Sequence, residues 1–492
     1  MTVDYASAEV LSFASISISQ KRRQQPFGHT SQTHIYNKFS RRTMIATWTP
    51  RVSLERNIAV HPFNSTVSPN GELKKGVAAA VQIHNTVEPD INLDKKSLHY
   101  EANSSESMVA KLPEMPGLPF PSMQRAILTP EMGENLNLVL GNIAVREPDY
   151  GEAVIQIIYT GICRSDASFS VGPGSGYPKQ NHIAGHEGIG RVVKSHDPFI
   201  IGRIFGIRYL GKSCGSCTYC IRSLFTSCPS QLNVPKHITG TFQEYATVPT
   251  SCLVPLPDAL LRGDVDLAFY TAALCSGSTA LVSVRATKAS LGDVVIVVGV
   301  AGAIGHLTGA IAKQVFGARV IGIDLKSKID ILQSQDHGDY SDILLGAPEP
   351  DMGDAWSNFY SILMQSCGKL RRNHGLRRAA EAVIVASSSF SAFQRLDEYV
   401  CDGGRIVCVG VPKGNNNICL PLHSVVERNL HVSGNLMGGH REALEVMEYI
   451  ATGQIKPRVT KVALEDIPEQ MQHLVHCKTA GKIVVCMSAS QH

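Results

Sequence analysis

Three patterns of hydrophobic and polar positions follow one another along the 492-residue chain. Residues 1 to about 118 show no sustained apolar period and are rich in Ser, Thr and Asn, so we predict no regular element there. From Met123 to about residue 260, short β-like runs separated by Gly and Pro predict a small, mostly β domain. One of these runs, Glu152–Tyr159, leads into a Gly-Ile-Cys turn.

Helix-like and strand-like patterns alternate from about residue 270 to 432. This alternation favours a parallel sheet with helices on its faces. The last sixty residues carry an amphipathic helix pattern at Arg441–Thr452 and end in a strand-like run at Lys482–Met487.

The almost wholly apolar run Val294–Ala312 could be mistaken for a membrane span. Its length is at the short end for a span, and it contains the His306 imidazole and glycines at 299, 302, 305 and 309. We therefore interpret it as a buried strand, a turn and a helix.

This run is part of a complete dinucleotide-binding pattern. Asp293–Val298 predicts a buried strand, the glycine turn follows, a helix extends to about Phe316, and Ala318–Ile323 predicts a second strand closed by Asp324. Because such a turn places a helix N-terminus against a pyrophosphate, the turn is a predicted cofactor site. Its residues are Gly299, Gly302, Ala303, Ile304 and Gly305.

Two glycines and one acid have separate roles in this prediction. Gly302 lets the backbone approach the pyrophosphate, and Gly305 lets helix and strand pack closely. Val300 stands where the fingerprint has its first glycine. Asp324 can accept both ribose hydroxyls, which favours NAD over NADP, whereas Lys326 and Lys328 leave open a contact to a 2′-phosphate.

Four cysteines lie within fifteen residues in the spacing Cys-x2-Cys-x2-Cys-x7-Cys: Cys214, Cys217, Cys220 and Cys228. Four thiolates this close together predict a closed, tetrahedral, structural zinc site. The spacing differs from that of zinc fingers and ribbons, which pair two separated Cys-x2-Cys knuckles.

Three further potential ligands lie apart in the sequence: Cys163, His186 and Cys275. Two thiolates and one imidazole leave a fourth position open on zinc, as a catalytic site needs. With the four-cysteine cluster, they give metal roles to six of the thirteen cysteines. We interpret the remaining seven as buried core thiols: Cys252, Cys367, Cys401, Cys408, Cys419, Cys477 and Cys486.

Residues 122 to 488 resemble the zinc-containing medium-chain alcohol dehydrogenases, with the fungal and bacterial enzymes closest in pattern. The resemblance is carried by the Cys163 turn, Gly-His-Glu-Gly at 185–188, the cysteine cluster, Gly-Thr-Phe-Gln-Glu-Tyr-Ala at 240–246, Leu-Cys-Ser-Gly at 274–277 and the glycine turn. It implies an α/β fold in which a GroES-like, mostly β catalytic domain surrounds a Rossmann domain, with the active site between them. The implied cofactors are two Zn²⁺ per subunit and NAD(H).

The resemblance also implies residue roles. Zinc on Cys163, His186 and Cys275 would polarise the alcohol oxygen, and hydride would pass between the carbinol carbon and the nicotinamide. Ser165 would contact the substrate oxygen and begin a proton relay, and Asp166 would orient His186. Glu187 would be either a transient zinc ligand or an ordinary hydrogen-bonding acid, and Arg164 would contact the pyrophosphate.

Three departures from the family pattern matter. Ser168 stands where the proton relay often ends in a histidine, so the proton must leave through water or another base. The second pyrophosphate arginine, expected near Met437–Arg441, falls where the chain is two residues short, and His440 or Arg441 would have to replace it. The Gly-Asp-Arg-Val turn reads Gly202-Arg-Ile-Phe and lacks its acid. Tyr177 and Leu436 are candidates for the substrate pocket.

We predict residues 1–120 as a disordered extension, 121–275 as the catalytic domain, 276–432 as the Rossmann domain and 433–492 as a return to the catalytic domain. Translation from Met44, Met108 or Met123 would remove much of the extension. The predicted location is the cytoplasm, or the mitochondrion if the basic, Ser-rich start is a transit peptide.

The predicted function is interconversion of a small-molecule alcohol and an aldehyde or ketone by a homodimer or homotetramer. The alternative is a non-catalytic relative that keeps zinc and the dinucleotide for stability or sensing. A formal charge of only +4 with 18% charged residues argues against nucleic-acid and membrane partners. A zinc-free quinone-reductase-type relative would not need the cysteine and histidine ligands.

Overall fold

The computed structural model describes residues 117–133, 135–171, 180–262, 264–335, 337–348, 353–371, 379–412, 414 and 417–487. The predictions for residues 1–120 therefore lie almost entirely outside the described residues. Among the helices within these ranges, none has both the length and the apolarity that crossing a membrane requires.

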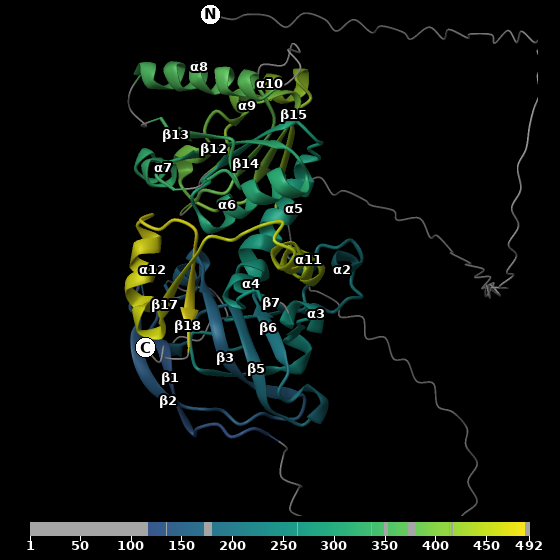
Figure 1. Ribbon diagram of the computed structural model, residues 1–492, viewed down its shortest axis with the longest axis vertical. Coiled ribbons are helices and arrows are strands. Elements are labelled where there is room, and N and C mark those ends of the chain that lie inside the picture. The colour runs from purple at the N-terminus through teal and green to yellow at the C-terminus, as the bar shows by residue number, and fades with distance from the viewer. Residues whose placement is uncertain are drawn as a thin grey trace, which may run out of the picture. The chain divides into compact units, whose positions relative to one another are not determined.

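The predicted catalytic domain is built on β-sheets (Figure 1). The largest has the order β10 (Val254–Pro255), β6 (Ile204–Arg208), β5 (Glu187–Ser195), β3 (Glu152–Ile162), β18 (Lys482–Cys486) and β17 (Val459–Ala463), and β9 (Tyr245–Pro249) also pairs with β3. Smaller sheets join β2 (Val139–Ala144), β1 (Met123–Glu131) and β4 (Gln180–His182), and β7 (Leu210–Lys212) with β8 (Leu232–Asn233). Its short helices are α1 (Arg164–Phe169), α2 (Thr218–Ile221), α3 (Asp258–Leu261) and α4 (Ala268–Ala272).

The second domain has a six-stranded parallel sheet. Its order is β13 (Ile343–Gly346), β12 (Arg319–Asp324), β11 (Val294–Val298), β14 (Ala380–Val385), β15 (Val400–Cys408) and β16 (His431–Gly434). Numbered along the chain, this order is 3-2-1-4-5-6, that of the dinucleotide-binding Rossmann fold. The helices that lie between α4 and the end of this sheet in the chain are α5 (Ser278–Thr287), α6 (Ala303–Ala310), α7 (Lys326–Gln333), α8 (Gly353–Leu370), α9 (Leu396–Tyr399) and α10 (Leu422–Glu427).

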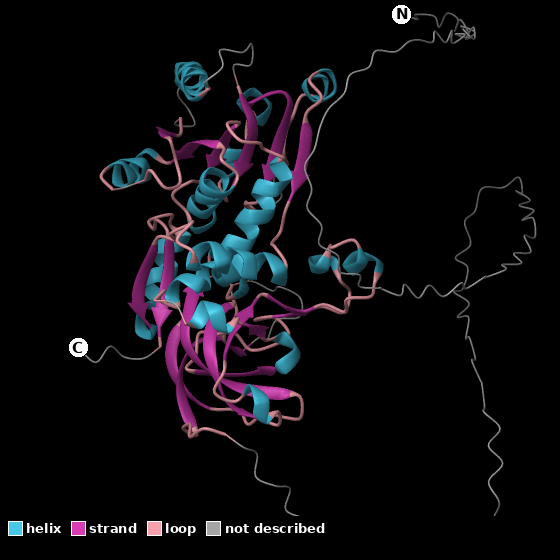
Figure 2. Ribbon diagram, turned by 45° about the vertical axis from the view of Figure 1, so that its right-hand side comes forward, coloured by secondary structure: helices cyan, strands magenta, loops and turns pink. Residues whose placement is uncertain are grey.

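Both faces of this sheet are buried, which explains why β11 reads as an unbroken apolar run. Val295 and Val297 pack in the core that includes residues of α5, α6 and α7, whereas Ile296 packs in the core that includes residues of α8 and α9. Figure 2 shows helices on both sides of these strands. Because successive side chains of a strand point to opposite faces, one apolar run supplies both cores.

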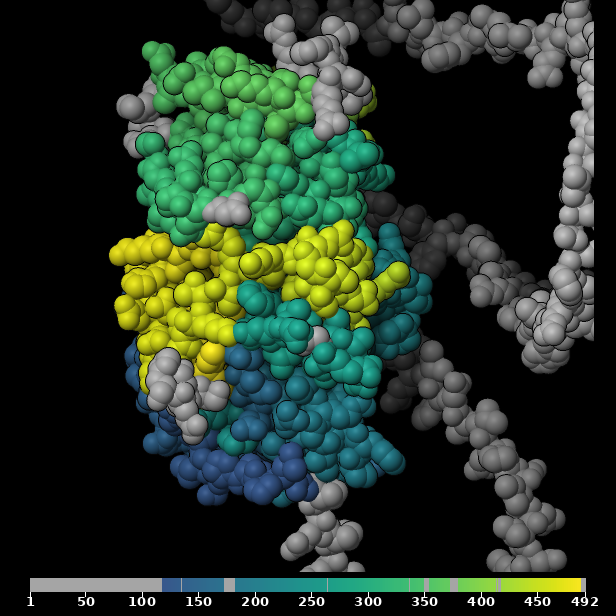
Figure 3. Space-filling model, in the orientation of Figure 1, coloured from purple at the N-terminus to yellow at the C-terminus, as the bar shows by residue number. Residues whose placement is uncertain are grey.

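The chain then continues through α11 (His440–Ala451), β17, α12 (Ile467–Val475) and β18, and these two strands join the large sheet that contains β3. β18 pairs with β3, so the end of the chain joins the sheet that carries the Cys163 turn. Figure 3 shows these last segments, in yellow, on the surface between the green and the blue parts of the molecule. β16 ends at Gly434, whereas the predicted domain boundary lies at 432.

The main local predictions are confirmed. The run at Glu152–Tyr159 forms β3, the dinucleotide unit forms β11, α6 and β12, and the last two patterns form α11 and β18.

The prediction for the cysteines outside the metal clusters is partly wrong. Cys252, Cys367 and Cys401 are buried and Cys408 and Cys486 are partly buried, but Cys419 and Cys477 are exposed. Apolar neighbours in sequence do not bury a thiol when its segment lies on the surface.

Candidate active site

Three separate segments bring one cluster of metal-binding side chains together. Cys163 precedes α1 at the end of β3, His186 precedes β5, and Cys275 lies in a π-helical turn at Ala273–Gly277. One potential ligand atom from each of these residues and from Glu187 lies within 4.8 Å of the others. The three ligands predicted from distant sequence positions are therefore neighbours in space.

Asp166 fixes the orientation of the His186 ring. Its Oδ1 lies 2.7 Å from His186 Nδ1, and it also accepts hydrogen bonds from the Gly185 and Cys163 backbone amides. Asp166 is fully buried. A carboxylate on Nδ1 selects the tautomer that leaves Nε2 free for a metal ion.

The two thiols of the cluster differ, because the hydrogen bond between them lowers the pKa of Cys163 and raises the pKa of Cys275 well above its ordinary value. The hydrogen bond from Cys275 is the main cause that lowers the pKa of Cys163 well below its ordinary value, although burial opposes it. The thiolate is the form that binds zinc. Two sulfurs and one imidazole nitrogen therefore fit a catalytic zinc ion. Glu187 Oε1, which has no hydrogen-bond partner among the described residues, lies 3.9 Å from His186 Nε2.

Two buried cations, neither of which we predicted, lie behind the cluster. Lys482 forms an ion pair with Glu187 and donates a 3.0 Å hydrogen bond to the Ile162 carbonyl, and both charged side chains are fully buried. A Cβ on Gly161 would lie 2.3 Å from Glu187 Oε2, so this pair requires glycine there.

The second buried cation is Arg208. Its guanidinium donates to the carbonyls of Leu274 and Gly438, and burial lowers its pKa to about 10. These two hydrogen bonds hold the turn that carries Cys275 against the start of α11.

A cavity of about 1020 Å³ joins this cluster to the predicted cofactor turn. Of the predicted site residues, its wall contains Cys163, Arg164, Ser165, His186, Cys275, Gly299, Gly302, Ala303, Ile304 and Asp324. Ser165 Oγ donates a 3.2 Å hydrogen bond to Cys163 Sγ and lies 3.5 Å from His186 Nε2. The hydroxyl thus faces two of the three residues that would hold a metal ion.

Gly305 is not in the cavity wall. A Cβ at this position would lie 2.0 Å from the Gly299 carbonyl oxygen, so the residue serves close packing of the turn against α6. Asp324 accepts hydrogen bonds from the Ala301 and Leu325 amides and keeps further lone pairs for a ligand.

The residues predicted for the substrate pocket and for the second pyrophosphate contact differ in where they lie. Leu436 lines the cavity, as do Phe169, Tyr209 and Ser168, whereas Tyr177 lies outside the described residues. Neither His440 nor Arg441 is in the described cavity wall, and their contact with a pyrophosphate stays a prediction. Phe169 and Tyr209 stack 5.6 Å apart and both meet the His186 ring edge-on.

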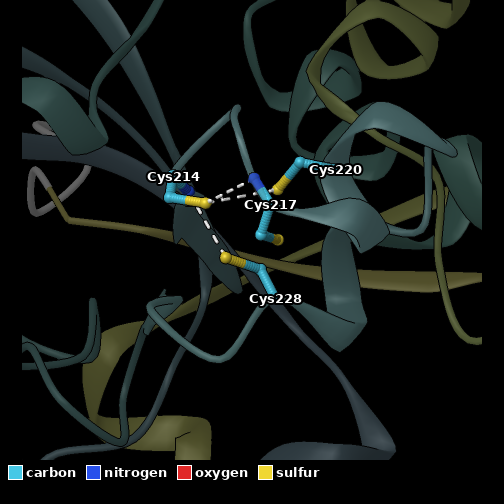
Figure 4. Close-up of side chains that lie close together, drawn as sticks. All are labelled: Cys214, Cys217, Cys220 and Cys228. Carbon is cyan, nitrogen blue, oxygen red and sulfur yellow. Dashed lines mark hydrogen bonds between the residues drawn. The ribbon is translucent and has the colours of Figure 1, made fainter. Parts of the chain in front are cut away.

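The four-cysteine cluster gathers in one lobe (Figure 4). One potential ligand sulfur from each of Cys214, Cys217, Cys220 and Cys228 lies within 4.8 Å of the others. Backbone amides of Ser216 and Cys217 lower the pKa of Cys214 to about 6, so this sulfur already favours the thiolate. The donor set fits a four-sulfur zinc site with no position left for a substrate.

Cys217→Ser should mainly destabilise the protein. We expect one zinc ion per subunit to be lost, together with roughly 3 kcal/mol of stability, because structural zinc contributes folding free energy directly. Metal analysis and thermal unfolding measure both effects. Ser230→Ala, an exposed change in the same lobe, is the matched control. A Cys217→Ser protein that folds and assembles normally but loses catalysis would contradict this division of labour.

Comparison with known proteins agrees with the site. Residues 149–258 match the family model of the alcohol dehydrogenase GroES-like domain, and residues 303–452 match that of the zinc-binding dehydrogenase. Alcohol dehydrogenase 2 of Emericella nidulans is 28% identical over 378 residues, covering 75% of this chain and 98% of that protein. An alcohol dehydrogenase of Geobacillus stearothermophilus is 28% identical over 338 residues, covering 68% and 91%.

Solved structures share the fold. A crystal structure of an NAD-dependent alcohol dehydrogenase has a TM-score of 0.62 at 23% identity and covers 74% of this chain and 100% of that one. The alcohol dehydrogenase of Aeropyrum pernix has a TM-score of 0.61 at 19% identity, with coverage of 74% and 100%.

The chain belongs to the zinc-containing medium-chain alcohol dehydrogenase family. It is accordingly a zinc-dependent, NAD-linked oxidoreductase, with a GroES-like domain and a Rossmann domain.

Proposed function

We propose that this protein interconverts an alcohol and an aldehyde or ketone in the cavity that joins Cys163, His186 and Cys275 to the glycine turn. The single observation that carries the proposal is this shared cavity. Zinc held by the three ligands would act as a Lewis acid on the substrate oxygen, and the nicotinamide of a bound dinucleotide would supply or accept the hydride.

The chain's own residues position the substrate, the ligand imidazole and the cofactor. Ser165 Oγ contacts the substrate oxygen and receives its proton, Asp166 orients His186, and Arg164 contacts the pyrophosphate. His186 is the sole histidine in the described part of the cavity wall. The proton therefore leaves past Ser168 through cavity water.

The wall beside the cluster favours an apolar substrate. The stacked rings of Phe169 and Tyr209 and the side chain of Leu436 offer apolar surface and no charge. We propose aliphatic or benzylic alcohols rather than charged ones, because burying an unpaired charge against these side chains would be costly.

Zinc content and alcohol-dependent NADH formation at 340 nm test the proposal. We expect two zinc ions per subunit and turnover on at least one primary, secondary or benzylic alcohol. A protein with full zinc that turns over none of these alcohols, nor the corresponding aldehydes and ketones, would be the non-catalytic relative.

We further propose a homo-oligomer joined at the edge of the Rossmann sheet. The last strand, β16, leaves its outer edge unpaired in the described sheet, and Val432, Val426 and Leu422 are 46%, 65% and 75% exposed. Exposed apolar side chains on an edge strand and on the helix α10 before it favour pairing with a second copy, which the molar mass in solution would test. Cytoplasmic location stays a prediction, for which the mature N-terminus and cell fractionation are the tests.

A further inference from the structure

Arg208 joins two walls of the cavity from behind. It is the last residue of β6, lies across from Glu187 of β5, and its side chain is buried. Its Nε donates a 3.4 Å hydrogen bond to the carbonyl of Leu274, and a terminal nitrogen donates to the carbonyl of Gly438. Leu274 precedes the proposed ligand Cys275. One side chain therefore bonds the backbone of two segments that are far apart in the sequence.

Stability does not explain an arginine at this position. Among the described residues, Arg208 takes part in no ion pair with a carboxylate. Burying a cation without such a partner costs stability, and an apolar side chain of similar volume would cost less. Arginine instead supplies a planar set of five N–H donors, which can bond two carbonyls in different directions at once. Its contribution therefore lies in joining the two segments.

The first segment, the π-helical turn Ala273–Gly277, has strong hydrogen bonds of its own. The carbonyl of Cys275 accepts hydrogen bonds from the hydroxyls of Ser278 at 3.0 Å and Thr279 at 2.7 Å, which tie the turn to the start of α5. In Figure 1, α11 lies beside α4 and α5, the helices before and after this turn. The turn is thus a fixed anchor next to the metal-binding cluster.

The second segment, residues 435–439, links β16 to α11 and has no regular structure. Leu436 and Met437 of this linker are in the cavity wall, and Leu436 is 61% exposed. Gly438 packs tightly against α5, since a Cβ there would overlap the Ser278 carbonyl oxygen. Because no helix or strand fixes the linker, its middle is held by this glycine contact and by the guanidinium.

We propose that Arg208 is a positioning residue for substrate selection: by bonding Gly438 to Leu274, it sets the distance between the linker side chains and the metal-binding cluster, and with it the width of the substrate pocket. This inference rests on the proposed function of the same cavity. Without the guanidinium the linker moves outward, so a bulky alcohol gains room and a small alcohol loses contact on one side. Small displacements matter, because a shift of about 1 Å can cost roughly 100-fold in rate.

Binding of alcohols to the protein with Co²⁺ in place of the catalytic zinc ion tests this role without turnover. The visible absorption of thiolate-bound Co²⁺ reports both the ligand geometry and the binding of an alcohol. Arg208→Met should change the ratio of the Kd values for ethanol and benzyl alcohol at least about 10-fold in favour of benzyl alcohol, the scale of discrimination by an apolar pocket. The absorption of the alcohol-free protein should stay the same, because Ser278 and Thr279 still hold Cys275.

Arg428→Met is the matched control. The Arg428 guanidinium also donates to two backbone carbonyls, those of Asp397 at 2.9 Å and Val400, but Arg428 is not in the described cavity wall. Its replacement should lower the thermal stability and leave the ratio of the two Kd values unchanged. A purely structural role of Arg208 would give the same result as this control.

Two further variants test the linker if Arg208→Met does not fold. Gly438→Ala keeps the arginine but forces the linker away from Ser278, so the Kd ratio should change in the same direction. Arg208→Lys keeps the charge and reaches one carbonyl at a time, so its change in the ratio should be smaller than that of Arg208→Met.

The outcomes separate this proposal from the proposed function. An unchanged Kd ratio in the folded Arg208 and Gly438 variants would overturn it. Equal losses of affinity for both alcohols with altered Co²⁺ absorption would also overturn it, since Arg208 would then only support the Cys275 ligand. Protein that shows the changed ratio but turns over no alcohol would refute the enzymatic function and leave the role of Arg208 intact. Wild-type protein whose Co²⁺ absorption responds to no alcohol would refute both.

Discussion

Replacing Cys163 by Ala is expected to lower kcat/KM at least about 1000-fold, or ~4 kcal/mol of transition-state stabilisation. Cys163 supplies one of two sulfurs in a cluster whose donor atoms lie within 4.8 Å of one another. Removing it leaves two of the three proposed ligands, and the Lewis-acid contribution of the metal is worth several kcal/mol. Metal analysis should show one zinc ion per subunit instead of two, with the loss confined to this site.

Two further variants show whether the loss comes from the metal site. Cys252→Ala removes a buried thiol from the core of the same domain and should leave zinc content and kcat/KM nearly unchanged. Asp166→Asn keeps all three ligands but weakens the hold on His186 Nδ1, so an intermediate loss of about 10- to 100-fold is expected. Equal activity in Cys163→Ala and wild type would exclude the proposed zinc ligands.

The fold and the proposed ligand set could be predicted because their signals are local. The four-cysteine spacing, the turns around Cys163 and Cys275, and the strand-turn-helix-strand-acid order of the dinucleotide unit are each readable within a short stretch. A parallel strand buried on both faces must be apolar throughout, so β11 is visible without its partners.

What the sequence could not reveal depends on contacts between distant segments. Lys482 opens a strand after a glycine, where a lysine is ordinarily exposed, and only the pairing of β18 with β3 brings it to Glu187. Arg208 is the last residue of β6, and nothing near it in the sequence predicts that it is buried and meets the turn of Cys275.

The error on Cys419 and Cys477 has the same origin. Cys419 lies between Ile418 and Leu420 and is nevertheless exposed, and Cys477, which follows the apolar pair Leu474-Val475 by two residues, is exposed as well. Cys477 lies in the cavity wall, where Arg164 Nη1 is 3.3 Å from its sulfur. Burial is set by which segments cover a residue, and this information is absent from its immediate neighbours.

Replacing Lys482 by Met should destabilise the protein by about 3–5 kcal/mol, the usual cost of removing one partner from a buried ion pair. Lys482 and Glu187 are both fully buried, so the variant leaves a carboxylate without its cation. Denaturant unfolding at fixed zinc concentration measures this loss. Lys461→Met is the matched control: Lys461 pairs with Asp266 on the surface, where its side chain is 44% exposed, and its loss should cost about 1 kcal/mol or less.

The stability that Lys482→Met loses relative to wild type should depend on pH in a defined direction. Burial raises the pKa of Glu187 to about 7 even though Lys482 opposes this shift, so removing Lys482 raises the pKa further. A carboxyl whose pKa is higher in the folded state than in the unfolded chain binds its proton more tightly when folded. Lowering the pH from above 7 towards 5 therefore stabilises the variant relative to its unfolded state, and the deficit against wild type should shrink.

The double variant Glu187→Gln, Lys482→Met completes the test. If the deficit of Lys482→Met comes from the stranded carboxylate, removing that charge should restore more than half of the lost stability, because a neutral pair in place of a buried ion pair costs little. The restored protein should also lose the pH dependence described above. Strictly additive losses in the two single variants would mean that the ion pair contributes no coupling energy and that Lys482 acts only through its packing and its hydrogen bond to Ile162.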